Sequence, residues 1–396
     1  MFFDCNYVDY IACANIPTAV KSKAADSFCS KLKKKFFSER VIMKDFGIVK
    51  STGEHAYLIT LTNKNGMSVD LSTLGATIVS IRVPDKNNNL TDVVQGYTSC
   101  ENYTDFPVGH AGGTIGPCAN KIFDGTFVLN GKRYELEKNK DNGKTHCHGA
   151  SQGFDIKNWN YELVKNGVKF SYLKKDGEGG YPANVNVYVT YTLTDKNELK
   201  IDYSANTDAD TVLNLTNHSY FNLDGEVNAE ENSVLNHIVQ LPSSSEFTVN
   251  NNYAVPTGEI KKVKDTPFDF LSPAKIKDKI SAENDQLKIG SGFDQNYSID
   301  NYDGKNMIEI AKIKSEKTGI VLKVFTNLPG FQFYTANHLG KSSQPVGKSG
   351  KRYERRSSLC VEPQFYPNAV NMPDFESPVL KKNAQFNRSI IYTFEI

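Results

Sequence analysis

Hydrophobic and polar residues alternate over short runs along most of this chain, which is the period of strands with one face in a core. The clearest run places apolar side chains at every second position of residues 185–193. Further strands are predicted at 57–62, 67–71, 75–83, 127–134, 199–204, 320–325, 330–335 and 389–395. Polar turns separate these runs, and Asn130-Gly131 is a strong hairpin signal. The one helix-length pattern covers residues 274–283.

This pattern predicts an all-β protein, a large antiparallel β-sandwich rather than a βαβ sheet. Residues 43–396 are expected to form one such domain. Residues 1–42 differ in composition and hold three of the seven cysteines. Acidic and amide side chains interrupt their apolar residues, so they do not match a signal peptide. We interpret them as an N-terminal extension of unknown role.

The charge balance argues against nucleic acid as a partner, because 46 basic and 45 acidic residues leave a net charge of +1. No apolar run reaches the length of a membrane span, so no membrane partner is expected. The seven cysteines are odd in number and irregular in spacing, without a C-x-x-C pair. That usage favours free thiols in a reducing compartment over a disulfide framework.

Residues 214–225, Asn-Leu-Thr-Asn-His-Ser-Tyr-Phe-Asn-Leu-Asp-Gly, hold the densest polar chemistry in the chain. Buried polar groups are costly unless each finds a partner. One interpretation is therefore a satisfied structural network within a β-rich core. The other is a site built around His218, whose imidazole can exchange a proton near neutral pH.

Two other segments carry polar groups near turns. The glycine-rich segment 109–122 lacks the spacing of a phosphate loop, and its Asn120-Lys121 offers two donors to a ligand. His146-Cys147-His148 resembles a metal-binding sequence. Adjacent residues of a strand point to opposite faces, however, and no second ligand pair lies nearby in the sequence. We therefore predict no metal.

Carboxylates are the remaining candidates. Asp269 and Asp294 each lie beside a turn, where capping is the ordinary role, and Gln332 lies in an aromatic strand. Glu362 is surrounded by apolar residues and prolines. A carboxyl group in such surroundings tends to have a raised pKa, which suits proton transfer.

Taken together and in order, these segments resemble the aldose 1-epimerase, or galactose mutarotase, family. The matching pieces are 119–122, 148–155, 214–225, 266–269, 292–294, 329–335 and 362–371. The resemblance implies a galactose mutarotase-like supersandwich that interconverts the anomers of a hexose, galactose or glucose, without a cofactor. It implies Glu362 as general base and His218 as general acid. It also implies sugar contacts from Asn120, Lys121, His148, Tyr220, Asp269 and Gln332.

The sequence departs from the family pattern at several positions, including Lys121 where arginine is usual, Ala150 for glycine and Pro363 for threonine. These departures leave open a non-catalytic sugar-binding protein on the same fold. A glycoside hydrolase using Glu362 with Asp269 or Asp294 is a third hypothesis. Two glycosylation sequons lie inside 214–225, which favours a cytoplasmic protein, and a monomer is the default expectation.

Overall fold

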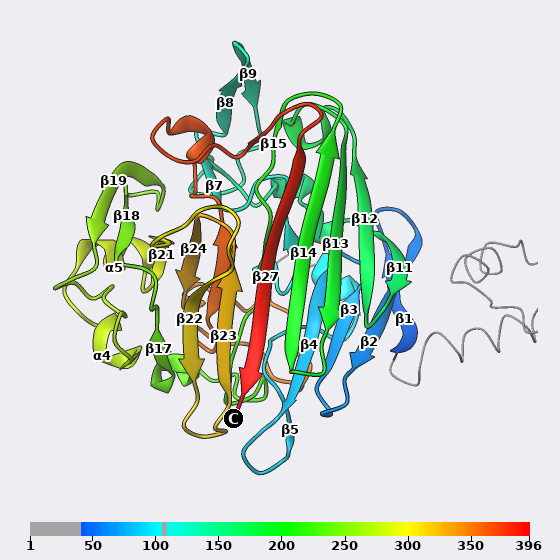
Figure 1. The fold of residues 1–396 in the computed structure, drawn as a ribbon, viewed down its shortest axis with the longest axis vertical. Helices are drawn as coiled ribbons and strands as arrows, with labels where there is room; N and C mark the ends of the chain where they lie inside the picture. Colours follow the sequence, from blue (N-terminus) through cyan, green and yellow to red (C-terminus); the bar gives the residue numbers. More distant parts are fainter. Residues whose placement is uncertain (1–40, 105–108) are drawn as a thin grey trace, which may run out of the picture.

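Three large antiparallel sheets organise the computed structural model, which describes residues 41–104 and 109–396 (Figure 1). The first five-stranded sheet has the order β1 (Val41–Val49), β2 (Glu54–Thr62), β3 (Ser68–Ser72), β4 (Thr77–Pro84), β5 (Leu90–Asp92). The nine-stranded sheet has the order β11 (Asn160–Val164), β12 (Gly167–Lys174), β13 (Val185–Leu193), β14 (Glu198–Thr207), β27 (Gln385–Glu395), β23 (Val321–Thr326), β22 (Ile308–Lys314), β17 (Ile238–Gln240), β20 (Ala274–Lys275). The second five-stranded sheet has the order β19 (Pro256–Lys262), β18 (Glu246–Asn250), β21 (Asp294–Ser298), β24 (Gly330–Tyr334), β25 (Cys360–Gln364).

Short elements connect the large sheets. The two-stranded pairs are β6 (Thr114–Ile115) with β16 (Thr216–Asn217), β7 (Lys121–Phe123) with β10 (Thr145–Cys147), β8 (Thr126–Leu129) with β9 (Lys132–Glu135), and β15 (Thr211–Val212) with β26 (Val379–Leu380). Within residues 41–104 and 109–396, the α-helices are α3 (Glu101–Thr104), α4 (Lys277–Ile280) and α5 (Asp285–Gly290). The 3-10 turns are η2 (Ala150–Gln152), η3 (Phe154–Ile156), η4 (Glu178–Gly180), η5 (Ser233–Asn236) and η6 (Ala369–Asn371).

The predicted all-β sandwich is confirmed, and each predicted strand run corresponds to a strand or a hairpin. The predicted helix over 274–283 is wrong. Its first two residues form β20, which pairs with β17 at the edge of the nine-stranded sheet, and α4 covers only four residues. Sheet pairing at that edge overrides the local helical pattern. The predicted extension 1–42 lies outside the described residues apart from its last two, where β1 begins.

The main core lies between the layers. In Figure 1, β2, β3 and β4 lie behind β12, β13 and β14. Side chains from both layers, such as Ile59 and Ile81 from one and Val187 and Ile201 from the other, are fully buried in one cluster. The alternation that predicted these strands therefore marks the faces that meet in the sandwich.

The second five-stranded sheet has one apolar and one polar face. Phe331 and Phe333 of β24 join the main core cluster. Gln332 and Tyr334, at the alternate positions, point to the opposite face. That face carries the polar side chains from which the site is built.

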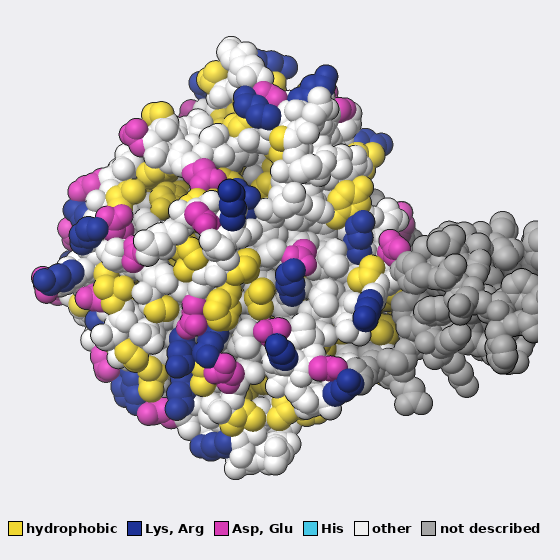
Figure 2. Space-filling model, viewed as in Figure 1, with side chains coloured by type: hydrophobic (Ala, Val, Ile, Leu, Met, Phe, Trp, Pro, Cys, Tyr) yellow, Lys and Arg dark blue, Asp and Glu magenta, His cyan; other side chains and the backbone are white. Residues whose placement is uncertain are grey.

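The face of the molecule seen in Figure 2 shows no dominant charge. Figure 2 shows basic and acidic side chains mixed with hydrophobic ones over the nine-stranded sheet. Among the residues that the structure describes, no helix is long and apolar enough to cross a bilayer. The four cysteines within residues 41–104 and 109–396 are free and buried, namely Cys100, Cys118, Cys147 and Cys360.

Candidate active site

Glu362 lies in a row of polar residues that crosses three neighbouring strands. In β25 it stands directly opposite Gln332 of β24, which stands opposite Asn296 of β21. Residues opposite one another in an antiparallel sheet share a face, so these side chains form one row. The next row on that face contains Cys360 and Asp294. Sheet register therefore collects polar groups from three distant parts of the sequence.

His218 reaches this row from a separate segment that is fixed by the glycine-rich loop. Its backbone N–H donates to the Gly113 carbonyl at 3.1 Å, and its carbonyl accepts from Gly112 N–H at 2.9 Å. Gly112 has φ +68°, and a Cβ there would lie 2.0 Å from the Ile78 carbonyl oxygen. Glycine adopts a positive φ readily and has no Cβ to collide with the Ile78 carbonyl. Residue 112 of the loop that binds the His218 backbone is therefore glycine.

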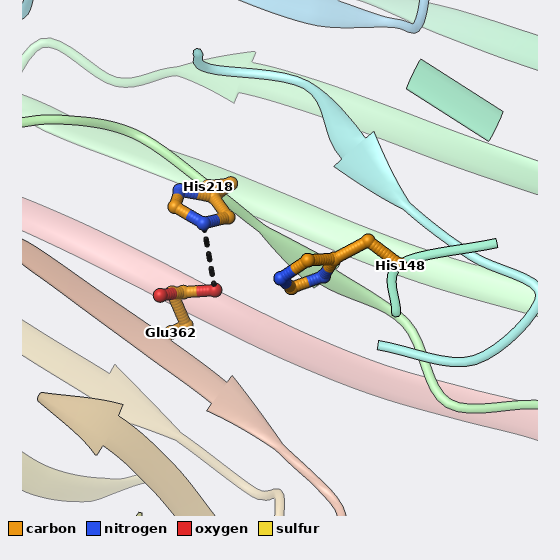
Figure 3. Close-up of side chains that lie close together, drawn as sticks. All are labelled: His148, His218 and Glu362. Atoms are coloured by element: carbon orange, nitrogen blue, oxygen red, sulfur yellow. Dashed lines mark ion pairs between the residues drawn. The ribbon is translucent and has the colours of Figure 1, made fainter. Parts of the chain in front are cut away.

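His218 and Glu362 form the central pair of the site (Figure 3). Nε2 of His218 lies 3.5 Å from Oε2 of Glu362, whose residue is only 2% exposed. That separation is long for a hydrogen bond, and Oε2 has no hydrogen-bond partner among the described residues. The carboxylate oxygen is therefore available to a ligand. On the other side of the ring, Nδ1 lies 3.6 Å from the Cys360 sulfur, and Tyr220 stacks on the imidazole at 5.0 Å.

His148 and the Asn120-Lys121 pair enter through the small β7–β10 sheet. Lys121 stands opposite Cys147 in that sheet, which places His148 beside Asn120. The Asn120 backbone N–H donates to Nδ1 of His148 at 3.2 Å. Nζ of Lys121 is 2.9 Å from the Asp141 carboxylate and donates to the Tyr253 carbonyl at 2.6 Å. Figure 3 shows the His148 ring pointing toward the central pair.

Burial sets the protonation behaviour of the central pair. Burial disfavours charge, and it is the main reason that the pKa of His218 is lowered from its ordinary value to about 3. Burial also raises the pKa of Glu362 well above its ordinary value, and the negative charge of Asp294 adds to this. The two groups therefore favour an uncharged state, with the shared proton on Glu362.

His148, His218 and Glu362 lie close enough together to suggest a metal centre. One ligand atom from each of His148, His218 and Glu362 lies within 4.8 Å of the others. However, the Asn120 N–H occupies the lone pair of Nδ1 in His148, so the hydrogen of the neutral ring is on Nε2. A nitrogen that carries hydrogen does not ligate a metal. His148 is thus arranged as a hydrogen-bond donor toward the site.

The structure brings together most of the residues expected from the sequence, which are His218, Glu362, Asn120, His148, Tyr220 and Gln332, with Lys121 beside them. For Asp269 the structure shows a hydrogen bond that its Oδ1 accepts from the Leu271 N–H within its own turn. That bond involves one of the two carboxylate oxygens, so sugar binding by Asp269 stays a prediction from the sequence. Asp294 instead accepts from Gln332 Nε2 at 2.6 Å, and its charge acts on Glu362. Its place on the polar face follows from the register of β21, which the sequence alone does not reveal.

His110 and Asp155 are further residues to which the sequence assigned no role. Nδ1 of His110 lies 2.7 Å from Oδ2 of Asp155, and its ring is 4.8 Å from that of His148 and 6.1 Å from that of His218. A histidine within the glycine-rich segment was the available signal.

Comparison with known proteins gives a consistent result. The aldose 1-epimerase family profile matches residues 57–393. Galactose mutarotases from Sus scrofa and Homo sapiens are each 36% identical over 330 residues, which is 83% of this chain and 92% of theirs. Aldose 1-epimerase from Escherichia coli (strain K12) is 32% identical over 348 residues, which is 86% of this chain and 96% of the relative.

Solved structures agree at the level of the fold. A GalM/aldose epimerase homologue from C. elegans superposes with a TM-score of 0.77 at 30% identity, covering 85% of this chain and 98% of that one. A galactose 1-epimerase from Lactobacillus acidophilus gives a TM-score of 0.75 at 22% identity, covering 90% and 98%. The fold and the matched sequence define a sugar isomerase built on a β-sandwich. The chain belongs to the aldose 1-epimerase family.

Proposed function

We propose that this protein interconverts the α and β anomers of a hexose, galactose or glucose, with Glu362 as general base and His218 as general acid. The observation that supports these roles is the enclosed imidazole–carboxylate pair, 3.5 Å apart, with Oε2 of Glu362 unpartnered among the described residues. Anomer exchange needs one base and one acid at the same centre. The neighbouring donors and acceptors, including Gln332, His148 and Asn120, are suited to sugar hydroxyls.

Ring opening begins when Glu362 takes the proton of the C1 hydroxyl. The bond between C1 and the ring oxygen breaks, and His218 gives its proton to that oxygen. The resulting aldehyde rotates about C1–C2 and presents its other face. His218 then takes the proton back from the hydroxyl while Glu362 returns its own to the carbonyl oxygen, so the ring closes as the other anomer.

The burial of the pair contributes to this cycle. Ring opening starts from ionised Glu362 and protonated His218 and ends with both groups neutral. Because burial raises the pKa of Glu362 and lowers that of His218, it destabilises the ion pair relative to the neutral pair. During ring opening, proton transfer from the C1 hydroxyl to Glu362 and proton transfer from His218 to the ring oxygen are therefore both favoured. The neutral pair is the state required for ring closure.

The two alternatives predict different chemistry. A glycoside hydrolase needs two carboxyl groups flanking the scissile bond. Among the described residues, the ion-pair partner of Glu362 is instead the imidazole of His218. A non-catalytic sugar-binding protein would retain the hydrogen-bonding residues and lack acceleration.

Three assays, polarimetry, sugar binding and glycoside cleavage, distinguish these functions. Freshly dissolved α-galactose and α-glucose are followed to anomeric equilibrium with and without the protein. Accelerated equilibration supports the proposal, and the ratio of the two kcat/KM values gives the sugar preference. Saturable sugar binding without acceleration supports the binding protein, and release of reducing sugar from an aryl galactoside supports the hydrolase.

The proposal includes a monomeric, cytoplasmic protein that acts on free monosaccharide. The sequon residues Asn214 and Asn217 are buried, and their amides donate to backbone carbonyls. A glycan at either position would have to displace these contacts. This supports a compartment without glycosylation, and fractionation with size-exclusion chromatography tests both statements.

A further inference from the structure

His110 lies beside the His218–Glu362 pair, with its ring 6.1 Å from that of His218. It has a left-handed backbone with φ +57°, which is uncommon for a residue with a side chain. Its carbonyl accepts from the Gly113 N–H at 3.1 Å, and Gly113 in turn accepts from the backbone of His218. The loop that presents His110 is thus the one that fixes His218. Residues held in such a backbone conformation cluster at functional sites, which points to a role for the His110 side chain.

Asp155 orients the His110 ring. Its Oδ2 lies 2.7 Å from Nδ1 of His110, and the Asp155 side chain is buried while that of His110 is 20% exposed. Two glycines enclose Asp155: a Cβ at Gly113 would lie 2.6 Å from its Cβ, and one at Gly153 would lie 2.5 Å from its Oδ1. The carboxylate can only accept, so the hydrogen of the neutral His110 ring is on Nδ1. Nε2 is then an acceptor.

His110 and His148 therefore present opposite polarity to the site. Their ring centroids are 4.8 Å apart. Nε2 of His148 carries hydrogen because the Asn120 N–H occupies Nδ1, whereas Nε2 of neutral His110 has a free lone pair. A sugar hydroxyl is both a donor and an acceptor. Two neighbouring imidazoles of opposite polarity satisfy both of its needs at once.

We propose that His110, oriented by Asp155, is a further substrate-binding residue that accepts a hydrogen bond from the same sugar hydroxyl to which His148 donates. This inference rests on the proposed function. Because the contact is made by a fixed ring to a hydroxyl outside the Glu362–His218 proton transfers, it affects binding of the sugar and not the chemical step.

The test compares His110→Phe, which keeps an aromatic ring and removes the acceptor, with His110→Gln, which restores a polar group. His55→Phe is the matched control, because His55 also pairs with an aspartate, Asp45, at 3.1 Å, on the exposed β1–β2 edge. We expect His110→Phe to raise KM for galactose about 3- to 10-fold, the worth of one neutral hydrogen bond, with kcat within about 2-fold. His110→Gln should recover part of this loss and His55→Phe should change neither constant.

Deoxygalactoses lacking the 2-, 3-, 4- or 6-hydroxyl then identify the hydroxyl. One of them should bind wild-type protein about 10- to 100-fold more weakly than galactose, because it loses the hydrogen bonds to both His110 and His148. With that analogue, His110→Phe should lose nothing further. Asp155→Asn should raise KM in the same direction, and adding it to His110→Phe should have little further effect because the two residues act as a unit.

Thermal melting separates a structural role from a binding role. If His110 only supports its loop, His110→Phe lowers the melting temperature and leaves KM unchanged for every sugar, and the inference is overturned. It is also overturned if kcat falls and KM does not. Wild-type acceleration is measured first, with calorimetric sugar binding alongside. If the protein binds sugar without accelerating anomer exchange, the catalytic proposal is refuted, and the sugar affinities of the His110 variants still test the role of His110. If the protein shows no binding and no acceleration, both proposals are refuted.

Discussion

Replacing Glu362 by glutamine removes the proton acceptor while keeping the shape of the side chain. A positioned general base contributes about 10²–10⁴-fold, which corresponds to about 3–5 kcal/mol of transition-state stabilisation. Glu362 is 2% exposed and its Oε2 is unpartnered among the described residues, so the substitution removes the proton acceptor without breaking a hydrogen bond of that oxygen. We therefore expect kcat/KM of Glu362→Gln to fall by at least about 100-fold, with the fold intact.

The assay is polarimetric equilibration of α-galactose at several enzyme concentrations, with circular dichroism and thermal melting on the same samples. Glu316→Gln is the control, because Glu316 is an exposed surface partner of Lys275. Its turnover should match that of the wild type. A folded Glu362→Gln variant that retains wild-type kcat/KM would refute the role of Glu362 as base.

The same variant also tests the pKa directions through stability. Glu362 has a raised pKa in the folded chain, so folding takes up a proton above the ordinary value of 4.5, and stability falls as the pH rises through that window. His218 acts oppositely: its stabilising effect is complete above its ordinary pKa of 6.5 and is lost as the pH falls toward about 3. Each contributes up to about 1.4 kcal/mol per pH unit. Urea unfolding across pH should show that Glu362→Gln loses only the first slope.

Three further substitutions have expected outcomes. Asp294→Asn removes a charge that raises the pKa of Glu362, so the acidic limb of the profile of kcat/KM against pH should move to lower pH; an unmoved limb would contradict this electrostatic coupling. Asp269→Asn should raise KM for galactose less than Asp294→Asn does, because the Asp269 carboxylate binds within its own turn, and the reverse order in the same polarimetric assay would support the sequence-based assignment. Lys174→Met leaves three backbone carbonyls without their buried donor and should lower the free energy of unfolding by about 3 kcal/mol. The control Lys175→Met, at an exposed position, should change it little. Equal urea midpoints for the two variants would show that the buried ammonium is not needed.

Four strands of the nine-stranded sheet, β13, β14, β23 and β27, were predictable because their signal is local. Alternation along residues 185–193 reflects one buried and one exposed face, and the burial of β13 follows that alternation. The predicted helix at 274–283 failed for the opposite reason, since pairing of Ala274 with Val239 depends on an edge strand elsewhere in the chain. A sequence window contains no information about which distant edge is available.

The site divides along the same line. The sequence by itself determined the strand pattern, the polar segment containing His218, and the apolar setting that suggested a raised pKa for Glu362. Only the tertiary structure decided that Glu362, Gln332 and Asp294 share one face and that His218 meets that face. Sheet register and loop closure bring these residues together, and both depend on contacts between residues far apart in the chain. Periodicity reports which way a side chain points, whereas packing alone determines what it points toward.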